Sequence, residues 1–273
     1  PDHATGLNFV QAEDSLSRLA LSVIEPFDDE LRMQKAAMFS DYLMQVLSED
    51  DSFRWPFDSL KTVSRLMAPD SSFRIMTWYV PLSRQRFRYF GVVQRPPSAD
   101  PPHLISLNDQ SDTIAHPLLA AHSAESWFGA WYYELIQVNA QDESGMQSQY
   151  ILLGWKGDNE QTRLRLIEPF AMTADGPVFG AQVFYEARGN PFRVVFEYSA
   201  RASMNLRYEG LQADHNGVQR PLIVFDRLVP MSEIMRGQRE FYIPDGERVD
   251  ALIFKNSHWH FVPDYDVSLL VPR

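Results

Sequence analysis

The alternation of apolar and polar residues near the middle of the chain predicts a β-hairpin. Residues 150–155 are apolar at almost every position, so both faces of this strand need cover from other parts of the protein. In residues 163–166 arginine and leucine alternate, which is the period-two pattern of a strand with one face in water. The polar residues 156–160 between them contain a glycine and predict a solvated turn. We therefore expect a central strand followed by a half-buried one.

The first 70 residues carry apolar residues at helical spacing instead. The pattern predicts a helix over residues 14–22 and a longer one directly after Asp28, which has the side chain of an N-cap residue. A third helix is expected over residues 60–67, because apolar residues recur there and the segment ends before Pro69. These segments together predict a helical N-terminal region.

From residue 73 onward the apolar pattern changes to period two. It predicts a hairpin over residues 73–94, an exposed proline-rich loop over 94–102 and a strand over 127–138 that pairs with the central strand. A weak helical patch over 118–122 interrupts the series. Further strands are expected at residues 178–185, 192–198, 205–209, 222–226, 239–243 and 249–254.

Strands that follow one another through short turns, with no helices between them, exclude a parallel α/β sheet. The predicted fold class is therefore α+β, with an N-terminal helical hairpin or bundle packed on a large antiparallel β-meander. The meander could close as a barrel, a sandwich or one strongly bent sheet. The predicted division is a helical region over residues 1–70 and a β-rich domain over 71–273, with one continuous domain as the alternative.

Charge and composition narrow the classes of partner. The formal net charge of −11 and the pI near 5.1 argue against nucleic acid as a partner, because its binding needs clustered positive charge. The absence of cysteine excludes disulfides, cysteine nucleophiles and thiolate metal sites. No apolar run approaches the ~18 to 20 residues of a transmembrane helix. We expect no cofactor, and an unidentified protein or small molecule as the ligand.

Two histidines form the best candidate for a metal site. His258 and His260 lie two residues apart, so on a strand both imidazoles point to the same face. A catalytic zinc usually takes three protein ligands, and Asp264 is the nearest further one. Pro263 should divert the chain before that aspartate, however, so its carboxylate need not return to the face of the histidines.

The alternative interpretation is an ordinary β-hairpin with exposed histidines. Asn256 and Ser257 predict a two-residue turn that leaves the histidines on the solvent face, where Lys255 lies opposite His258 and disfavours a cation. We therefore predict no stoichiometric transition metal at this pair. The same turn predicts two cross-strand pairs on the core face, Phe254 with Trp259 and Leu252 with Phe261.

Several carboxylates lie in or beside apolar strands, namely Glu168, Glu197, Glu209 and Asp226. Two of them converging inside the sheet system could act as a general acid and base. Carboxylates that point outward would carry no such role. The candidates for ligand binding are Glu197, Glu209, Asp226 and the aromatic Trp155. No residue is predicted to be catalytic, because the sequence contains no G-x-S-x-G, Walker A or G-x-G-x-x-G motif.

Two classes of function are compatible with these residues. The first is a noncatalytic binding or scaffolding module, which needs no motif. The second is a hydrolase that uses strand carboxylates, with metal assistance through His258 and His260 as one version. A pocket with converging Glu, Asp or His would favour the hydrolase, and a filled β core would favour the module.

Five strand segments share a similarity, at residues 150–159, 195–199, 206–209, 223–226 and 249–254. They resemble a group of uncharacterised, hypothetical proteins from Bacteroidetes bacteria. The likeness covers roughly residues 53–266. The group is expected to have Asp-Gly-Asn-Asn where this chain has Lys-Gly-Asp-Asn, at residues 156–159. It has no assigned activity, so the resemblance implies relatedness and an exported setting, in the periplasm or envelope.

Overall fold

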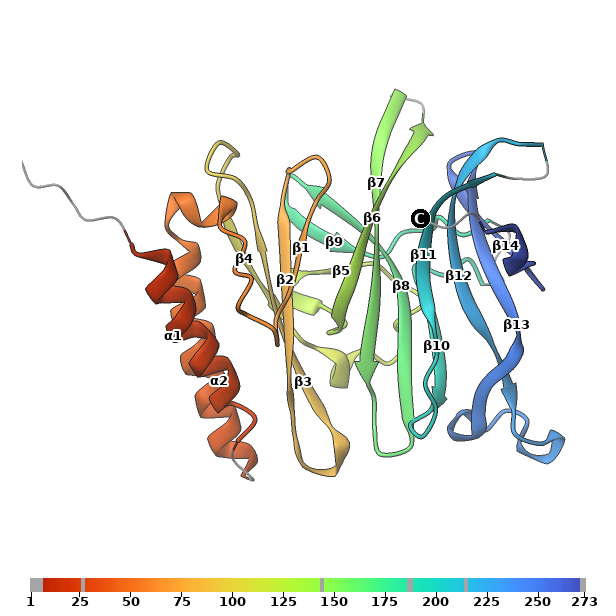
Figure 1. The fold of residues 1–273 in the computed structure, drawn as a ribbon, viewed down its shortest axis with the longest axis horizontal. Helices are drawn as coiled ribbons and strands as arrows, with labels where there is room; N and C mark the ends of the chain where they lie inside the picture. Colours follow the sequence, from red (N-terminus) through yellow and green to blue (C-terminus); the bar gives the residue numbers. More distant parts are fainter. Residues whose placement is uncertain (1–6, 26–27, 143–144, 186–188, 214–215, 271–273) are drawn as a thin grey trace, which may run out of the picture.

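The computed structural model of the protein places two helices and three antiparallel sheets side by side as successive layers (Figure 1). It describes residues 7–25, 28–142, 145–185, 189–213 and 216–270. The predicted α+β class and the N-terminal helical hairpin are confirmed. Short 3-10 turns connect the elements, at Asp50–Arg54, Ser83–Gln85, Ser111–Thr113, Ala124–Ser126, Glu233–Met235, Arg239–Phe241 and Val267–Leu269.

The helical layer consists of α1 (Phe9–Ser22) and α2 (Asp29–Leu47). The predicted N-cap of α2 is confirmed, because the Asp28 side chain accepts a hydrogen bond from the Leu31 backbone N–H at 2.9 Å. The apolar stripes of both helices pack on the first sheet, where Phe39 meets Trp78 edge to face. Within the described residues neither helix combines the length and the hydropathy needed to cross a membrane.

The first sheet has the order β1-β2-β3-β4. Its β1 (Ser64–Met67) shows that the predicted third helix over residues 60–67 is wrong. These residues pair with β2 instead, and Leu60 and Val63 enter the core beneath the helices from the turns before the strand. Tertiary pairing overrides a local pattern that fitted a helix equally well. The other strands are β2 (Arg74–Pro81), β3 (Phe87–Gln94) and β4 (Leu104–Asn108).

The middle sheet has the order β5-β9-β8-β7-β6, with β10 paired to β8 as well. The central strand was predicted correctly, because Leu152 packs toward the first sheet and Leu153 toward the third, both fully buried. The helical patch expected at residues 118–122 is wrong, since the chain turns there and enters β5. The strands are β5 (His122–Ser123), β6 (Trp131–Asp142), β7 (Gly145–Gly157), β8 (Thr162–Thr173), β9 (Gly176–Phe179) and β10 (Val194–Ser199).

The third sheet has the order β11-β12-β13-β14 and ends in the predicted turn. Asn256 and Ser257 have φ of 50° and 64°, as a two-residue hairpin turn requires, and both predicted cross-strand pairs form. One detail is corrected: Phe261 is 56% exposed rather than part of the core, because it lies beyond the cover of the middle sheet. The strands are β11 (Leu206–Ala213), β12 (Gln219–Pro230), β13 (Tyr242–Lys255) and β14 (His258–Val262).

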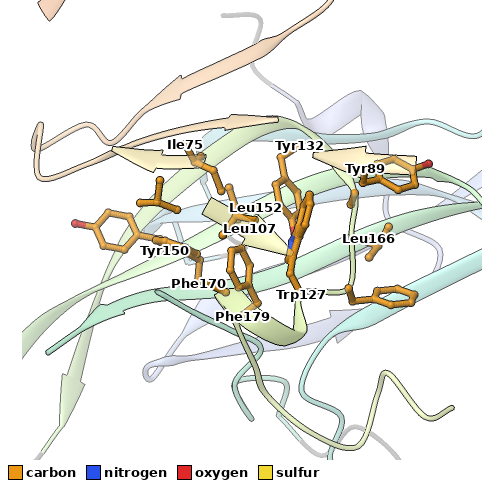
Figure 2. Close-up of a cluster of buried hydrophobic side chains, with 14 of the residues drawn as sticks. Ile75, Tyr89, Leu107, Trp127, Tyr132, Tyr150, Leu152, Leu166, Phe170 and Phe179 are labelled. Atoms are coloured by element: carbon orange, nitrogen blue, oxygen red, sulfur yellow. The ribbon is translucent and has the colours of Figure 1, made fainter. Parts of the chain in front are cut away.

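Hydrophobic cores fill both spaces between the sheets. Figure 2 shows the core between the first and middle sheets, where aromatic rings from β3, β6 and β9 meet aliphatic side chains of β7 and β8. A second core lies between the middle and third sheets and includes Ile151, Leu153 and Trp259. Of the predicted closures, the protein therefore adopts face-to-face packing of sheets, as in a sandwich, extended to three sheets.

Candidate functional site

A groove with a volume of about 690 Å³ opens where the middle sheet ends against the third sheet. We call it the β10 groove. Its volume is that of a typical ligand pocket, about 300 to 1,000 Å³. The loop 115–119 forms one wall, β10 forms the floor and strands of the third sheet form the other wall. Its lining residues from the strands and from the Arg239–Phe241 turn are Val195, Phe196, Glu197, Phe225, Arg227, Leu228, Arg239, Asp250 and Phe261.

The floor of the groove presents a free strand edge. Ala200 N–H donates to the Gln161 carbonyl at 2.7 Å, so in an antiparallel ladder alternate residues of β10 bond to β8 and the intervening ones face away. The backbone groups of Val195 and Glu197 are the ones that face away. Ser199 belongs to the same set, and its carbonyl accepts from Ala202 N–H at 3.0 Å. Across the described ranges, no backbone hydrogen bond is made to Val195 or Glu197 on this side.

The walls of the groove are apolar and partly aromatic. The rings of Phe196 and Phe225 lie 4.6 Å apart, and Phe225 stacks on Phe261 at 6.4 Å between centroids. Across the groove, Leu119 is 64% exposed. Exposed large apolar side chains that gather around a cavity, rather than being scattered singly, mark interaction sites.

The charges around the groove are close to balanced. Arg227 makes ion pairs with Asp250 and with Asp264, the latter at 2.7 Å. Burial raises the pKa of Glu197, and the more distant charge of Asp158 adds to that effect, while Arg239 opposes it. Arg239 itself lies over the Tyr242 ring at 4.6 Å. The groove therefore does not select strongly for a cation or an anion.

A buried ion pair fixes the wall formed by the loop 115–119. Arg193 and Glu168 are both fully buried, and the Arg193 Nε donates to Glu168 at 2.6 Å. The same guanidinium donates to the carbonyls of Ala120 at 3.1 Å and Phe179 at 3.0 Å. Phe192 N–H donates to the Leu118 carbonyl at 2.9 Å, one residue before Arg193. The start of β10 is thereby tied to the loop across the groove.

On its other side the buried Glu168 carboxylate accepts from one aromatic donor, Tyr132, which a second aromatic residue holds in place. Tyr132 donates its hydroxyl to Glu168 Oε2 at 2.8 Å, and Trp127 Nε1 donates to the Tyr132 oxygen at 3.0 Å. Burial, with the Glu168 charge next, raises the pKa of the Tyr132 hydroxyl well above its usual value. Glu168, one of the strand carboxylates noted in the sequence, is therefore fully buried and ties β8 to Arg193 and Tyr132, and it lines none of the described cavities.

Of the predicted ligand-binding residues, Glu197 alone lines the β10 groove. Glu209 forms an ion pair with Arg207 on β11, and Asp226 accepts two hydrogen bonds from Asn205. The Trp155 ring packs against aromatic rings of the first sheet at 5.3 Å. The predicted carboxylates therefore do not assemble into one site.

The histidine pair lies in a separate small cavity, with a volume of about 320 Å³. His260 stacks on Tyr185 at 4.3 Å, and His258 Nδ1 lies 3.0 Å from the Asn256 carbonyl. Asp264, the proposed third ligand, bonds to Arg227 at the β10 groove instead. In the part of the chain that the structure describes, no three His, Asp or Glu residues are grouped so that they could hold a metal ion.

Lys156 was expected in a solvated turn and is buried instead, with 4% exposure. Its Nζ donates to Ser111 Oγ and to the Gly129 carbonyl, each at 2.7 Å, and lies over the Tyr89 ring at 4.3 Å. Burial lowers the pKa of Lys156 to about 8, against the opposing charge of Asp109. Only the alternation along β7 could have indicated this, because residue 156 continues the inward-facing set of Leu152 and Gly154.

Comparison with family models, with curated proteins and with solved structures gave no match. The geometry of the β10 groove is therefore the basis for a functional inference. Its residues come from segments that begin near residues 115, 195, 225, 239, 250 and 261. No short sequence motif spans them, so only the fold brings them together.

Proposed function

We propose that the protein is a noncatalytic binding module whose ligand occupies the β10 groove. The observation that carries the proposal is a cavity of about 690 Å³ whose rim exposes Phe261 and Leu119 and whose floor is a free strand edge. These apolar side chains are exposed to water, so a ligand that buries them binds with a favourable hydrophobic free energy.

The placement of the carboxylates favours a binding module over a hydrolase. A pair of carboxylates acting as acid and base must face the same bond. Glu197 lines the groove. Glu209 instead pairs with Arg207, and Asp226 accepts a hydrogen bond from Asn205, outside the groove. Asp250, the other carboxylate at the groove, is held by Arg227.

The acidic net charge supports a ligand other than nucleic acid, as expected from composition. The resemblance to the Bacteroidetes group supports two further proposals: that those proteins share the layered fold, and that this protein works outside the cytoplasm.

The test uses anilinonaphthalene sulfonate, a fluorescent probe of apolar grooves, with the full chain. We expect saturable binding that Phe261→Ser and Leu119→Ser each weaken by about tenfold, equivalent to about 1.4 kcal/mol. Leu211→Ser is the matched control, because Leu211 is 59% exposed on β11 and lines none of the described cavities. Equal weakening by all three substitutions, or no binding, would refute the proposed site.

A further inference from the structure

We infer that the ligand of the β10 groove is an extended polypeptide segment that adds to β10 as a further strand. The inference rests on the proposed function and names its class of ligand. Strand addition to an exposed sheet edge is a general mode of peptide recognition, in which backbone hydrogen bonds supply affinity and side-chain pockets supply specificity.

The free edge has the spacing of a polypeptide backbone. Val195 and Glu197 are two residues apart on a strand, so their outward-facing groups repeat at about 6.8 Å. Each contributes one N–H donor and one C=O acceptor. An extended peptide matches all four groups at once, because its own donors and acceptors alternate with the same repeat.

The edge is open over a short window. Toward the N-terminus of β10, the Phe192 N–H is already bonded to the loop 115–119 through Leu118. Toward its C-terminus, the Ser199 carbonyl is bonded to Ala202, and the turn Arg239–Phe241 packs against the strand. The window between these closures accepts about four residues of an added strand, with the remainder of the ligand outside the groove.

The walls match the alternation of side chains along such a strand. Successive side chains of an added strand point to opposite sides of the sheet. One set meets the loop 115–119, and the other meets Phe225 and Phe261 of the third sheet. Each wall is mainly apolar, with His116 on the loop and the paired Arg227 and Asp250 on the third sheet, so the nearby charges are close to balanced. The segment should therefore be apolar on both faces and near neutral, rather than an acidic or basic peptide.

The first experiment measures amide hydrogen exchange in the full chain by NMR. The probe is a library of acetylated, amidated heptapeptides with valine, leucine or phenylalanine at alternate positions, from which the best displacer of anilinonaphthalene sulfonate is taken. At 100 times its Kd, exchange of the Val195 and Glu197 amides should slow by up to about 100-fold. The amides of Val194, Phe196 and Tyr198, already bonded to β8, serve as internal controls and should not change.

The second experiment removes one edge donor. Val195→Pro deletes an N–H that faces away from β8, so the fold should persist while peptide affinity falls at least about tenfold. Val195→Thr keeps the N–H and is the control. The same loss is expected when the peptide is N-methylated at the positions facing β10, whereas methylation at the alternate positions should have little effect.

The outcomes separate this inference from the proposed function. If anilinonaphthalene sulfonate binds at Phe261 but no peptide displaces it, the groove is a ligand site and the peptide inference is wrong. A peptide that binds without slowing exchange at Val195 and Glu197 also refutes strand addition. If neither probe binds, both proposals are wrong.

Discussion

Strands β7 and β10 belong to the same sheet and differ in almost every contact. β7 has a hydrogen-bonded neighbour on each edge, β6 and β8, and fully buried leucines on both faces. β10 is paired on one edge, and four of its six residues are only partly buried. One strand therefore supplies stability, while the other offers unused hydrogen-bonding groups at a fixed position. Rigid placement of an unfinished edge is what a preorganised binding site needs.

The largest effect is expected just before β10. Arg193→Met leaves the Glu168 carboxylate buried without its partner, which should lower the free energy of unfolding by about 3 to 5 kcal/mol. The measurement is denaturation in urea. The double variant Glu168→Leu with Arg193→Met is the control and should recover much of that loss, since no charge remains buried. A single variant as stable as the wild type would mean that the β10 region is only loosely held.

The next effect compares the two strands directly. Leu153→Ala should lower the free energy of unfolding by about 2 to 5 kcal/mol, because it opens a cavity in a strand covered on both faces. Val195→Ala should cost about 1 kcal/mol or less, because Val195 is only partly buried. Thermal or denaturant melting of both variants measures the difference. Equal losses would remove the distinction between a central strand and an open edge.

The polar end of β7 should make stability depend on pH. Burial lowers the pKa of Lys156 to about 8 in the folded protein, from 10.5 in the unfolded chain. Below pH 8 both states hold the proton and the cost of burying the charge is present in full. Between about pH 8 and 10.5 the unfolded state holds more protons, so stability rises with pH, by on the order of 3 kcal/mol over the whole window. Denaturation series of wild type and Lys156→Met isolate this contribution, and parallel curves would contradict it.

The smallest effect is expected for metal binding at β14. The free edge of β14 is paired with the chain around Val183 and Tyr185. Trp259 N–H donates to the Val183 carbonyl at 2.8 Å, and Tyr185 N–H donates to the Trp259 carbonyl at 2.9 Å. We expect elemental analysis of the purified protein to find no stoichiometric transition metal at His258 and His260. About one zinc per chain, lost when both histidines become alanine, would show that this edge also carries a site.

Local patterns were sufficient for the elements that depend on neighbouring residues. The turn at Asn256 and Ser257 follows from a two-residue loop between alternating strands, and the cap at Asp28 follows from one side chain. The helix predicted over residues 60–67 was wrong, because their apolar spacing fits a helix and a short strand equally well. Only the pairing with β2 decides between the two.

The candidate site was less predictable, because its properties arise between segments distant in the chain. Glu197 was identified as a carboxylate beside apolar strand residues, but no local pattern places it beside Leu119 and Phe261, which come from other segments. The burial of Lys156 likewise depends on Ser111 and Gly129, which come from other segments. The free edge of β10 depends on which strand is absent beside it, and no pattern within β10 encodes that.

The position of the middle sheet between two cores has a consequence for how the protein unfolds. Leu152 and Leu153 are adjacent in sequence and serve different cores, so neither core can separate without exposing side chains of β7. The two cores should therefore melt in one cooperative transition instead of as independent domains. The groove at the edge of that sheet would then stay formed up to the temperature at which the whole β structure is lost.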